Sequence, residues 1–145
     1  MMLLREITKI TLGQPRKNNT AAFIDEFFSE TQEHPFNSRA RIYNGAVIEI
    51  YPMGGNIHIS DVMTTAPKSG AGTGAIKFLT GLADKHRVKL ELVAKAYSKD
   101  KKYITDTEQL AKWYKRLGFH VDDEFIDDPD DIEGYEEINM TYFPR

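Results

Sequence analysis

Hydrophobic and polar positions in the middle of the chain predict three consecutive antiparallel strands. Two β-rich runs, 41–43 and 46–51, flank Asn44 and Gly45. Asn-Gly is the strongest short signal for a β-hairpin, because both turn positions need a positive φ. A second turn at 53–56 leads into a third run at 57–64. The simplest arrangement of these runs is a meander.

Two helices and a strand are predicted after the meander. Apolar residues recur at helical spacing in 75–86 and again in about 105–117, where Gly118 is the residue type preferred just past a helix end. A glycine-rich stretch, 67–74, precedes the first of these helices. The run 88–94 between the helices alternates apolar and polar residues and predicts a strand.

The N-terminal region predicts a strand at 3–11 and then a helix. A polar break at 13–19 separates the two, so that Asn19 or Thr20 can cap the helix. The helix is expected to end before Pro35, because proline disfavours helical conformation in the preceding residue.

The C-terminal region predicts two last strands, at 119–126 and 137–143. The fold class is therefore α+β, with a mixed, mostly antiparallel sheet of about six or seven strands and flanking helices in α/β/α layers.

Composition predicts one soluble domain spanning residues 1–145. The chain has 41% hydrophobic residues, a net charge of −3 and no cysteine. These values disfavour disorder, a general nucleic-acid binder, disulfides and cysteine-based metal sites. No apolar run approaches the ~20 residues of a membrane span, and Arg5, Glu6 and Lys9 come too early for a secretory signal. We expect a cytoplasmic protein, a monomer or a homodimer, without a metal.

The charge is unevenly distributed along the sequence. Ten acidic residues and no Lys or Arg lie between Asp122 and Glu137, whereas the other residues carry 19 positive and 12 negative charges. Such a run is most simply a solvated loop. The alternative is a field that attracts a cationic substrate.

Three glycines at alternate positions, Gly70, Gly72 and Gly74, suggest an anion site where a helix begins. Glycine lets the backbone approach a ligand, and the N-terminus of a helix carries a partial positive charge. A P-loop would need Lys and Ser or Thr after the last glycine, and a dinucleotide fold would need a different spacing. Coenzyme A is a third option, and a flexible turn without a ligand is the alternative.

Two motifs resemble the GNAT superfamily of N-acetyltransferases. The run 69–74, Ser-Gly-Ala-Gly-Thr-Gly, resembles that family's glycine loop, and 113–119, Trp-Tyr-Lys-Arg-Leu-Gly-Phe, resembles its second signature. One helix and one strand separate the motifs. The expected order of elements, strand, helix, three strands, helix, strand, helix and two strands, matches the family over nearly the whole chain. Ser69 stands where the family has Gln or Arg, and Thr107 where many members have Asn.

The resemblance implies that the protein transfers an acetyl group from acetyl-CoA to a primary amine by direct attack in a ternary complex. The acceptor is an unidentified small molecule or protein, for which the acidic run favours a cationic one. A longer acyl donor is equally compatible. The implied residues for the donor come from the third strand of the meander, the glycine loop and the second helix: Val62, Met63, Thr64, Lys68, Ser69, Gly70, Ala71, Gly72, Thr73, Gly74 and Thr107.

The implied catalytic residues are a base and an acid. Tyr114 stands at the family's tyrosine position and would protonate the departing thiolate. The candidates for the base are Asp61 and His58, together with Ser60 and, on the neighbouring strand, Glu49. A β-bulge in the strand would decide which of them faces the site. A different class of function, a catalytically weak or inactive binding or inhibitor module, remains an alternative.

Overall fold

The computed structural model describes residues 14–64, 70–95, 106–122, 124 and 126–145. A helix and a short strand precede the three-strand meander, two helices with a strand between them follow it, and two strands end the chain. The elements are α1 (Gln14–Glu30), β1 (Gln32–Glu33), β2 (Arg41–Tyr43), β3 (Ala46–Met53), β4 (Asn56–Thr64), α2 (Ala71–His86), β5 (Leu90–Ala94), α3 (Thr107–Arg116), β6 (His120–Val121) and β7 (Ile138–Tyr142).

Helix α1 begins earlier than the sequence indicates. The expected cap at Asn19 or Thr20 is wrong, because the helix already runs from Gln14. Pro15 is tolerated in the first turn, where its missing N–H has no helical partner. Thr20 instead donates its hydroxyl to the carbonyl of Gly55, at 3.2 Å. The strand expected at 3–11 lies outside the described residues.

The meander is confirmed. Asn44 and Gly45 have φ values of 45° and 85°, and β2 and β3 pair antiparallel on either side of them. The second turn also has positive φ, at Gly54 and Gly55, and joins β3 to β4. Since L-residues rarely adopt such φ values, the glycines determine where the chain reverses.

Strand β4 contains one extra residue. Glu49 of β3 lies opposite Asp61, and the next residue, Ile50, lies opposite Ile59. Ser60 therefore has no partner on β3 and forms a β-bulge, which bends the strand and increases its twist.

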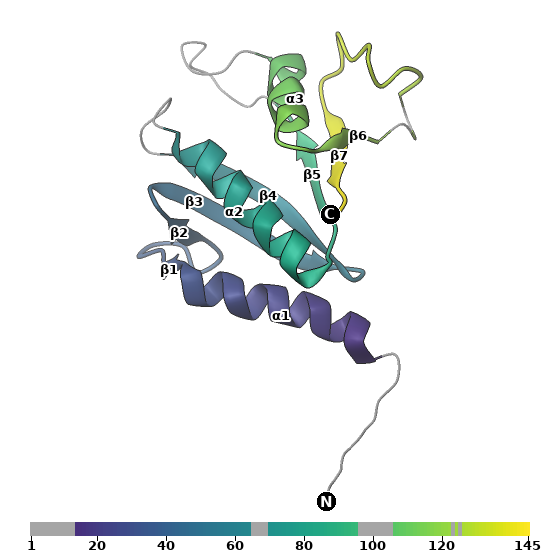
Figure 1. Cartoon of the computed structure of the whole chain (residues 1–145). Helices are drawn as coiled ribbons and strands as arrows, with labels where there is room; N and C mark the ends of the chain where they lie inside the picture. Colours follow the sequence, from purple (N-terminus) through teal and green to yellow (C-terminus); the bar gives the residue numbers. More distant parts are fainter. Residues whose placement is uncertain (1–13, 65–69, 96–105, 123, 125) are drawn as a thin grey trace, which may run out of the picture.

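The described strands form one seven-stranded sheet in the order β1-β2-β3-β4-β5-β7-β6. Only β4 and β5 are parallel, and they pair through just two positions, Ile57 with Leu90 and His58 with Glu91. Beyond His58 both strands continue but diverge, which Figure 1 shows as the separation of the β2–β4 meander from the β5–β7 part. The fold class is α+β, as expected.

Helices α1 and α2 pack against each other near the meander (Figure 1). Phe27 of α1 stacks on Phe78 of α2, and Ile76 and Leu79 of α2 are fully buried, as are Ile48 and Ile57 of the sheet. This core fixes the N-terminus of α2 beside the end of β4. None of the described helices combines the length and the apolar character that crossing a bilayer requires.

The C-terminal strands differ in length from expectation. The strand expected at 119–126 is shorter, since β6 contains only His120 and Val121. Beyond them Asp122 accepts a hydrogen bond from the Thr141 hydroxyl, at 2.8 Å. Acidic residues dominate the following sequence and have low β-propensity. Strand β7 agrees with its expected position.

Candidate functional site

The N-terminus of α2 has backbone features that an anion site would use. Gly70 precedes the helix in a left-handed conformation, with φ 87°, and no side chain caps it. The Gly74 N–H makes an early helical hydrogen bond, to the Gly70 carbonyl at 2.9 Å. No hydrogen bond within the described part of the chain uses the N–H groups of Gly72 and Thr73. These N–H groups are the donors that an anion at a helix start receives.

Three elements meet at this helix start. A Cβ on Gly72 would lie 3.6 Å from Thr64 Cγ2 and 3.8 Å from Trp113 Cη2, whereas a Cβ on Gly74 would meet nothing within 4 Å. Gly74 therefore presents open backbone, and Gly72 lets β4, α2 and α3 approach one another. The expected donor residues Gly70 to Gly74 lie together with Thr64; Lys68 and Ser69 are outside the described residues.

The last residues of β4 keep a free edge. Because pairing with β5 stops at His58, residues 62–64 have only β3 as a described neighbouring strand. Met63 is 55% exposed, and Val62 and Thr64 are half-buried. An extended amide chain can add to such an edge by backbone hydrogen bonds, as an extra strand would.

Asp61 faces another carboxylate. The register places Glu49 directly opposite on β3. Burial and then the charge of Glu49 raise the pKa of Asp61 above its usual 3.8, and a hydrogen bond from the Val62 N–H partly offsets the rise. Among the described residues no Lys or Arg forms an ion pair with either carboxylate. A carboxyl with a raised pKa close to a helix-bound tyrosine suits acid–base work.

Tyr114 of α3 lies within electrostatic reach of Asp61. Burial and then the negative charge of Asp61 raise the pKa of Tyr114 to about 12. Its ring is held between Trp113 and Phe119, with centroid distances of 4.9 and 5.5 Å. The phenol is thus a proton donor at neutral pH, and α3 sets its position.

His58 lies at the last position of β4 that pairs with β5. Its ring is 4.8 Å from that of Tyr51 between centroids. Its Nδ1 is buried and has no hydrogen-bond partner among the described residues. A buried nitrogen without a partner is costly unless water or a ligand contacts it. The bulge separates His58 from Asp61 along the strand, and a role for His58 stays a prediction.

Thr107 begins α3, one residue after the helix cap. Asp106 is the cap and accepts a hydrogen bond from the Gln109 N–H, at 2.8 Å. The Thr107 side chain is buried and donates its hydroxyl to the Glu136 carbonyl, at 2.9 Å. This hydrogen bond ties the acidic loop to α3, and a contact of Thr107 with the donor stays a prediction.

Sequence reasoning missed Asn37. Its side chain donates from Nδ2 to Glu49 Oε2, at 3.0 Å. Asn37 also lines a cavity of about 550 Å³ between the end of α1 and β2, together with aromatic side chains that include Phe28 and Phe36. In the sequence Asn37 is only a turn residue after a proline, and nothing in the pattern links it to Glu49.

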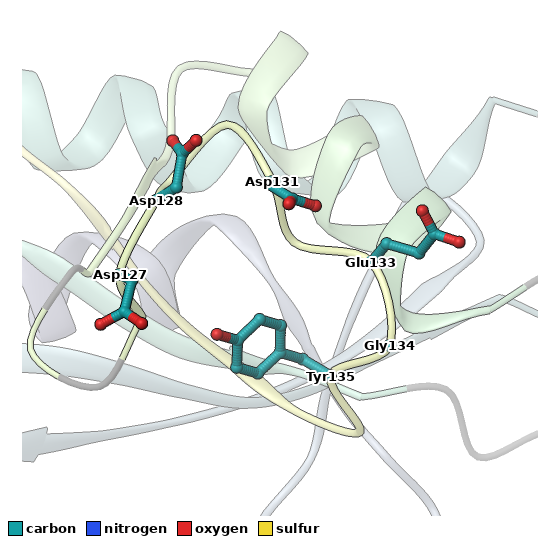
Figure 2. A pocket seen from close by; sticks show the side chains of 6 residues that line it. All are labelled: Asp127, Asp128, Asp131, Glu133, Gly134 and Tyr135. Atoms are coloured by element: carbon teal, nitrogen blue, oxygen red, sulfur yellow. The ribbon is translucent and has the colours of Figure 1, made fainter.

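The acidic loop between β6 and β7 forms a second cavity, of about 330 Å³ (Figure 2). Carboxylates surround the Tyr135 ring in Figure 2; they belong to Asp127, Asp128, Asp131 and Glu133. Lys115 of α3 approaches the neighbouring Asp130, with 3.7 Å between Nζ and Oδ1. The loop thus packs beside the helix that carries Tyr114. Within the described residues no group of three or more His, Asp or Glu could hold a metal ion.

Comparison with known proteins found no matching family model and no match among curated proteins. Several solved structures are similar in fold. The anti-CRISPR protein AcrVA5 is 23% identical, with a TM-score of 0.49, over 70% of this chain and 93% of its own. Nourseothricin acetyltransferase is 16% identical, with a TM-score of 0.44, over 79% and 71%. An acetyltransferase of Bacillus subtilis in complex with CoA is 15% identical, with a TM-score of 0.44, over 97% of each chain.

Proposed function

We propose that the protein is a GNAT-type N-acetyltransferase that transfers an acetyl group from acetyl-CoA to a primary amine. One observation supports this most strongly: the bulged strand β4 brings Asp61 within electrostatic reach of Tyr114, beside the uncapped start of α2. The site therefore combines a base, an acid and an anion-binding helix start at the place where β4 and β5 diverge.

Backbone groups of the protein, more than side chains, would bind acetyl-CoA. The N–H groups of Gly72 and Thr73 are available to the pyrophosphate, and the open space at Gly74 allows it to approach. Residues 62–64 of β4 have the free edge that the amide-containing pantetheine arm requires. Lys68 and Ser69 belong to the proposal through the sequence motif.

Asp61 is the proposed base. An alkyl ammonium has a pKa near ~10.4 and must lose a proton before its lone pair can attack. Asp61 takes that proton and passes it to water. The amine nitrogen then bonds to the thioester carbon, and the new amide nitrogen loses its second proton to Asp61. The carbon–sulfur bond breaks, Tyr114 gives a proton to the sulfur, and the proton on Asp61 replaces it. The balance is one amide, one thiol and one proton released.

Tyr114 is the proposed donor to the departing sulfur. At a pKa of about 12 the phenol stays protonated, but it is a weaker acid than an ordinary thiol, whose pKa is about 8.5. Full transfer would be uphill by roughly 5 kcal/mol. Because the charge of Asp61 is one cause of the raised pKa, protonation of Asp61 makes Tyr114 a better acid when the thiolate leaves.

Calorimetric titration of acetyl-CoA tests the donor half, with dephospho-CoA and ADP as controls. We expect micromolar binding. Absence of both binding heat and a thermal shift at millimolar acetyl-CoA would overturn the proposal. Tyr114→Phe should then bind acetyl-CoA within about twofold of wild type yet transfer the acetyl group about 10²-fold more slowly, the usual size of one acid–base contribution.

The acidic loop supports a cationic acceptor as part of the proposal. Four of its acidic residues line one cavity, so a positively charged amine would be concentrated there. Neutralising Asp127, Asp128 and Asp131 to Asn should raise the KM for a diamine severalfold and weaken its salt dependence. Unchanged turnover of the diamine would remove the cationic preference without affecting acetyl transfer itself.

A further inference from the structure

The side-chain amide of Asn37 has only one possible orientation. Its Oδ1 accepts a hydrogen bond from the Arg39 N–H, at 3.0 Å, which a side-chain NH₂ group could not do. The Nδ2 must therefore be the atom that faces Glu49, and it donates to Oε2 at 3.0 Å. The Ala40 N–H bonds to the Asn37 carbonyl, at 3.1 Å, and closes the turn that holds this residue.

Glu49, once held by Asn37, faces Asp61 without a counter-charge. The two residues are direct cross-strand neighbours, and like charges in that relation are destabilising. No hydrogen bond between described residues uses Glu49 Oε1, and no described cation pairs with either carboxylate. A bound cation would remove the repulsion.

The pair has two further neighbours, an acid and the wall of a cavity. Tyr114 is within reach of the Asp61 charge. Asn37, which donates to Glu49, lines the 550 Å³ cavity, with Phe28 and Phe36 among its walls. An amine whose organic group occupies this cavity would be separated from Glu49 only by the Asn37 side chain.

We propose that Asn37 positions Glu49 as the anchor for the acceptor's ammonium group, while Asp61 alone removes the proton. This inference rests on the proposed N-acetyltransferase function and gives the acceptor a chemical class: a primary amine that arrives protonated and carries an organic group into the cavity beside Asn37. The ammonium donates one N–H to Glu49 and gives another proton to Asp61. Glu49 keeps its charge throughout, and Asn37 touches no reacting atom.

Steady-state kinetics separate the roles, with benzylamine and putrescine as probes. Glu49→Gln should raise the amine KM about tenfold and leave kcat within twofold. Asp61→Asn should lower kcat about 10³-fold. Asn37→Ala should act as Glu49→Gln does, but more weakly, and should add nothing when Glu49 is already Gln. Equal losses of kcat in the Glu49 and Asp61 variants, or additive effects of Asn37 and Glu49, would overturn the inference.

Asn37→Asp is the matched variant. It keeps the oxygen that accepts from Arg39 but replaces the donor facing Glu49 by another acceptor. We expect a larger rise in KM than with Asn37→Ala, because repulsion displaces Glu49. A merely structural role of the turn predicts the reverse order, since Asp preserves the turn and Ala does not.

A measurement without turnover keeps this inference separate from the proposed function. Carboxyl ¹³C NMR follows the titration of Asp61, which faces Glu49 of β3 and Tyr114 of α3. Millimolar putrescine or benzylamine should shift its midpoint to lower pH in the wild type, and much less in Glu49→Gln. No shift with either amine would overturn the anchor even if acetyl-CoA binds; a shift without acetyl-CoA binding would instead contradict the acetyltransferase.

Discussion

Gly72 and Gly74 occupy the first turn of α2, where alanine would stabilise a helix. Glycine within a helix costs about 0.5–1 kcal/mol relative to alanine. Gly72 has a packing reason, because Thr64 and Trp113 lie against it. Gly74 has no such reason, since the space above it is open. The proposed acetyl-CoA site would use this open backbone at the start of the helix.

Gly74→Ala should therefore raise the free energy of unfolding by about 0.5–1 kcal/mol and weaken acetyl-CoA binding at least tenfold. Gly81→Ala is the control, because Gly81 lies on the same helix with nothing within 4 Å. It should give the same stabilisation with unchanged affinity. Urea denaturation and calorimetry measure both quantities. If the two variants bind acetyl-CoA equally well, Gly74 does not contact the donor.

The residues of the site differ in how well the sequence predicts them. The glycine loop and Tyr114 stand in local motifs, so their proximity to a helix start and a helix end follows from the pattern. Asp61 was one of several candidates, and only the bulge at Ser60 places it opposite Glu49. The partnership of Asn37 with Glu49 is a tertiary hydrogen bond between residues far apart in sequence, and no local pattern encodes it.

The β3–β4 hairpin pairs two carboxylates at a cost in stability. The folded state raises the pKa of Asp61, so the charged form is less favoured in the folded than in the unfolded chain. The contribution of Asp61 to stability should therefore fall as pH rises from about 4 through its raised pKa. Like charges directly opposite destabilise a sheet by roughly 0.2–1 kcal/mol.

Asp61→Asn should accordingly be about 0.5 kcal/mol more stable than wild type at pH 7, and equally stable near pH 3, below the raised pKa of Asp61. Denaturant titrations at the two pH values measure the difference. Glu49→Gln should behave similarly, and the double variant should gain little more. A loss of stability in Asp61→Asn at pH 7 would contradict the repulsive pair.

Helix α3 ends at a glycine that the fold requires. Gly118 has φ 104°, and a Cβ there would lie 3.0 Å from Cε2 of Tyr142. Gly118→Ala should cost about 2 kcal/mol, from backbone strain and crowding together. Gly134→Ala isolates the strain, because Gly134 has φ 88° and open space, and should cost about 1 kcal/mol. Thermal denaturation that ranks the two in reverse would contradict this account.

A contact between α2 and the C-terminal end of the chain joins two parts of the molecule that are far apart in sequence. The Tyr142 hydroxyl donates to Asp84 Oδ1, at 2.8 Å, and the Arg145 N–H donates to the same oxygen, at 2.9 Å. Tyr142→Phe keeps the ring but loses one hydrogen bond to a charged group. We expect a loss of about 1 kcal/mol and a fall in Tm of about 3 °C by calorimetry. An unchanged Tm would show that water replaces the hydroxyl without cost.

At the scale of the fold, the sequence predicts the elements that have local signals. The Asn-Gly and Gly-Gly turns, the alternating strands and the amphipathic face of α2 are all local, and the structure agrees with them. The predicted start of α1 and the predicted length of β6 were wrong, because Thr20 and Asp122 form hydrogen bonds with residues far away in the sequence. The two-residue pairing of β4 with β5 is likewise invisible in the pattern.

The bulge at Ser60 affects the shape of the proposed site but adds no cross-strand pair to the hairpin. From the turn to Ile59, which lies opposite Ile50, the pairing is regular; the extra residue Ser60 then shifts the register, so that Asp61 instead of Ser60 lies opposite Glu49. Deleting Ser60 would therefore preserve all eight cross-strand neighbours of β4 and remove only its bend. The codon for Ser60 thus affects the shape of the proposed site, whereas the pairing of the hairpin depends on the surrounding codons. If the proposed function is correct, an in-frame loss of that codon would leave a folded chain without activity.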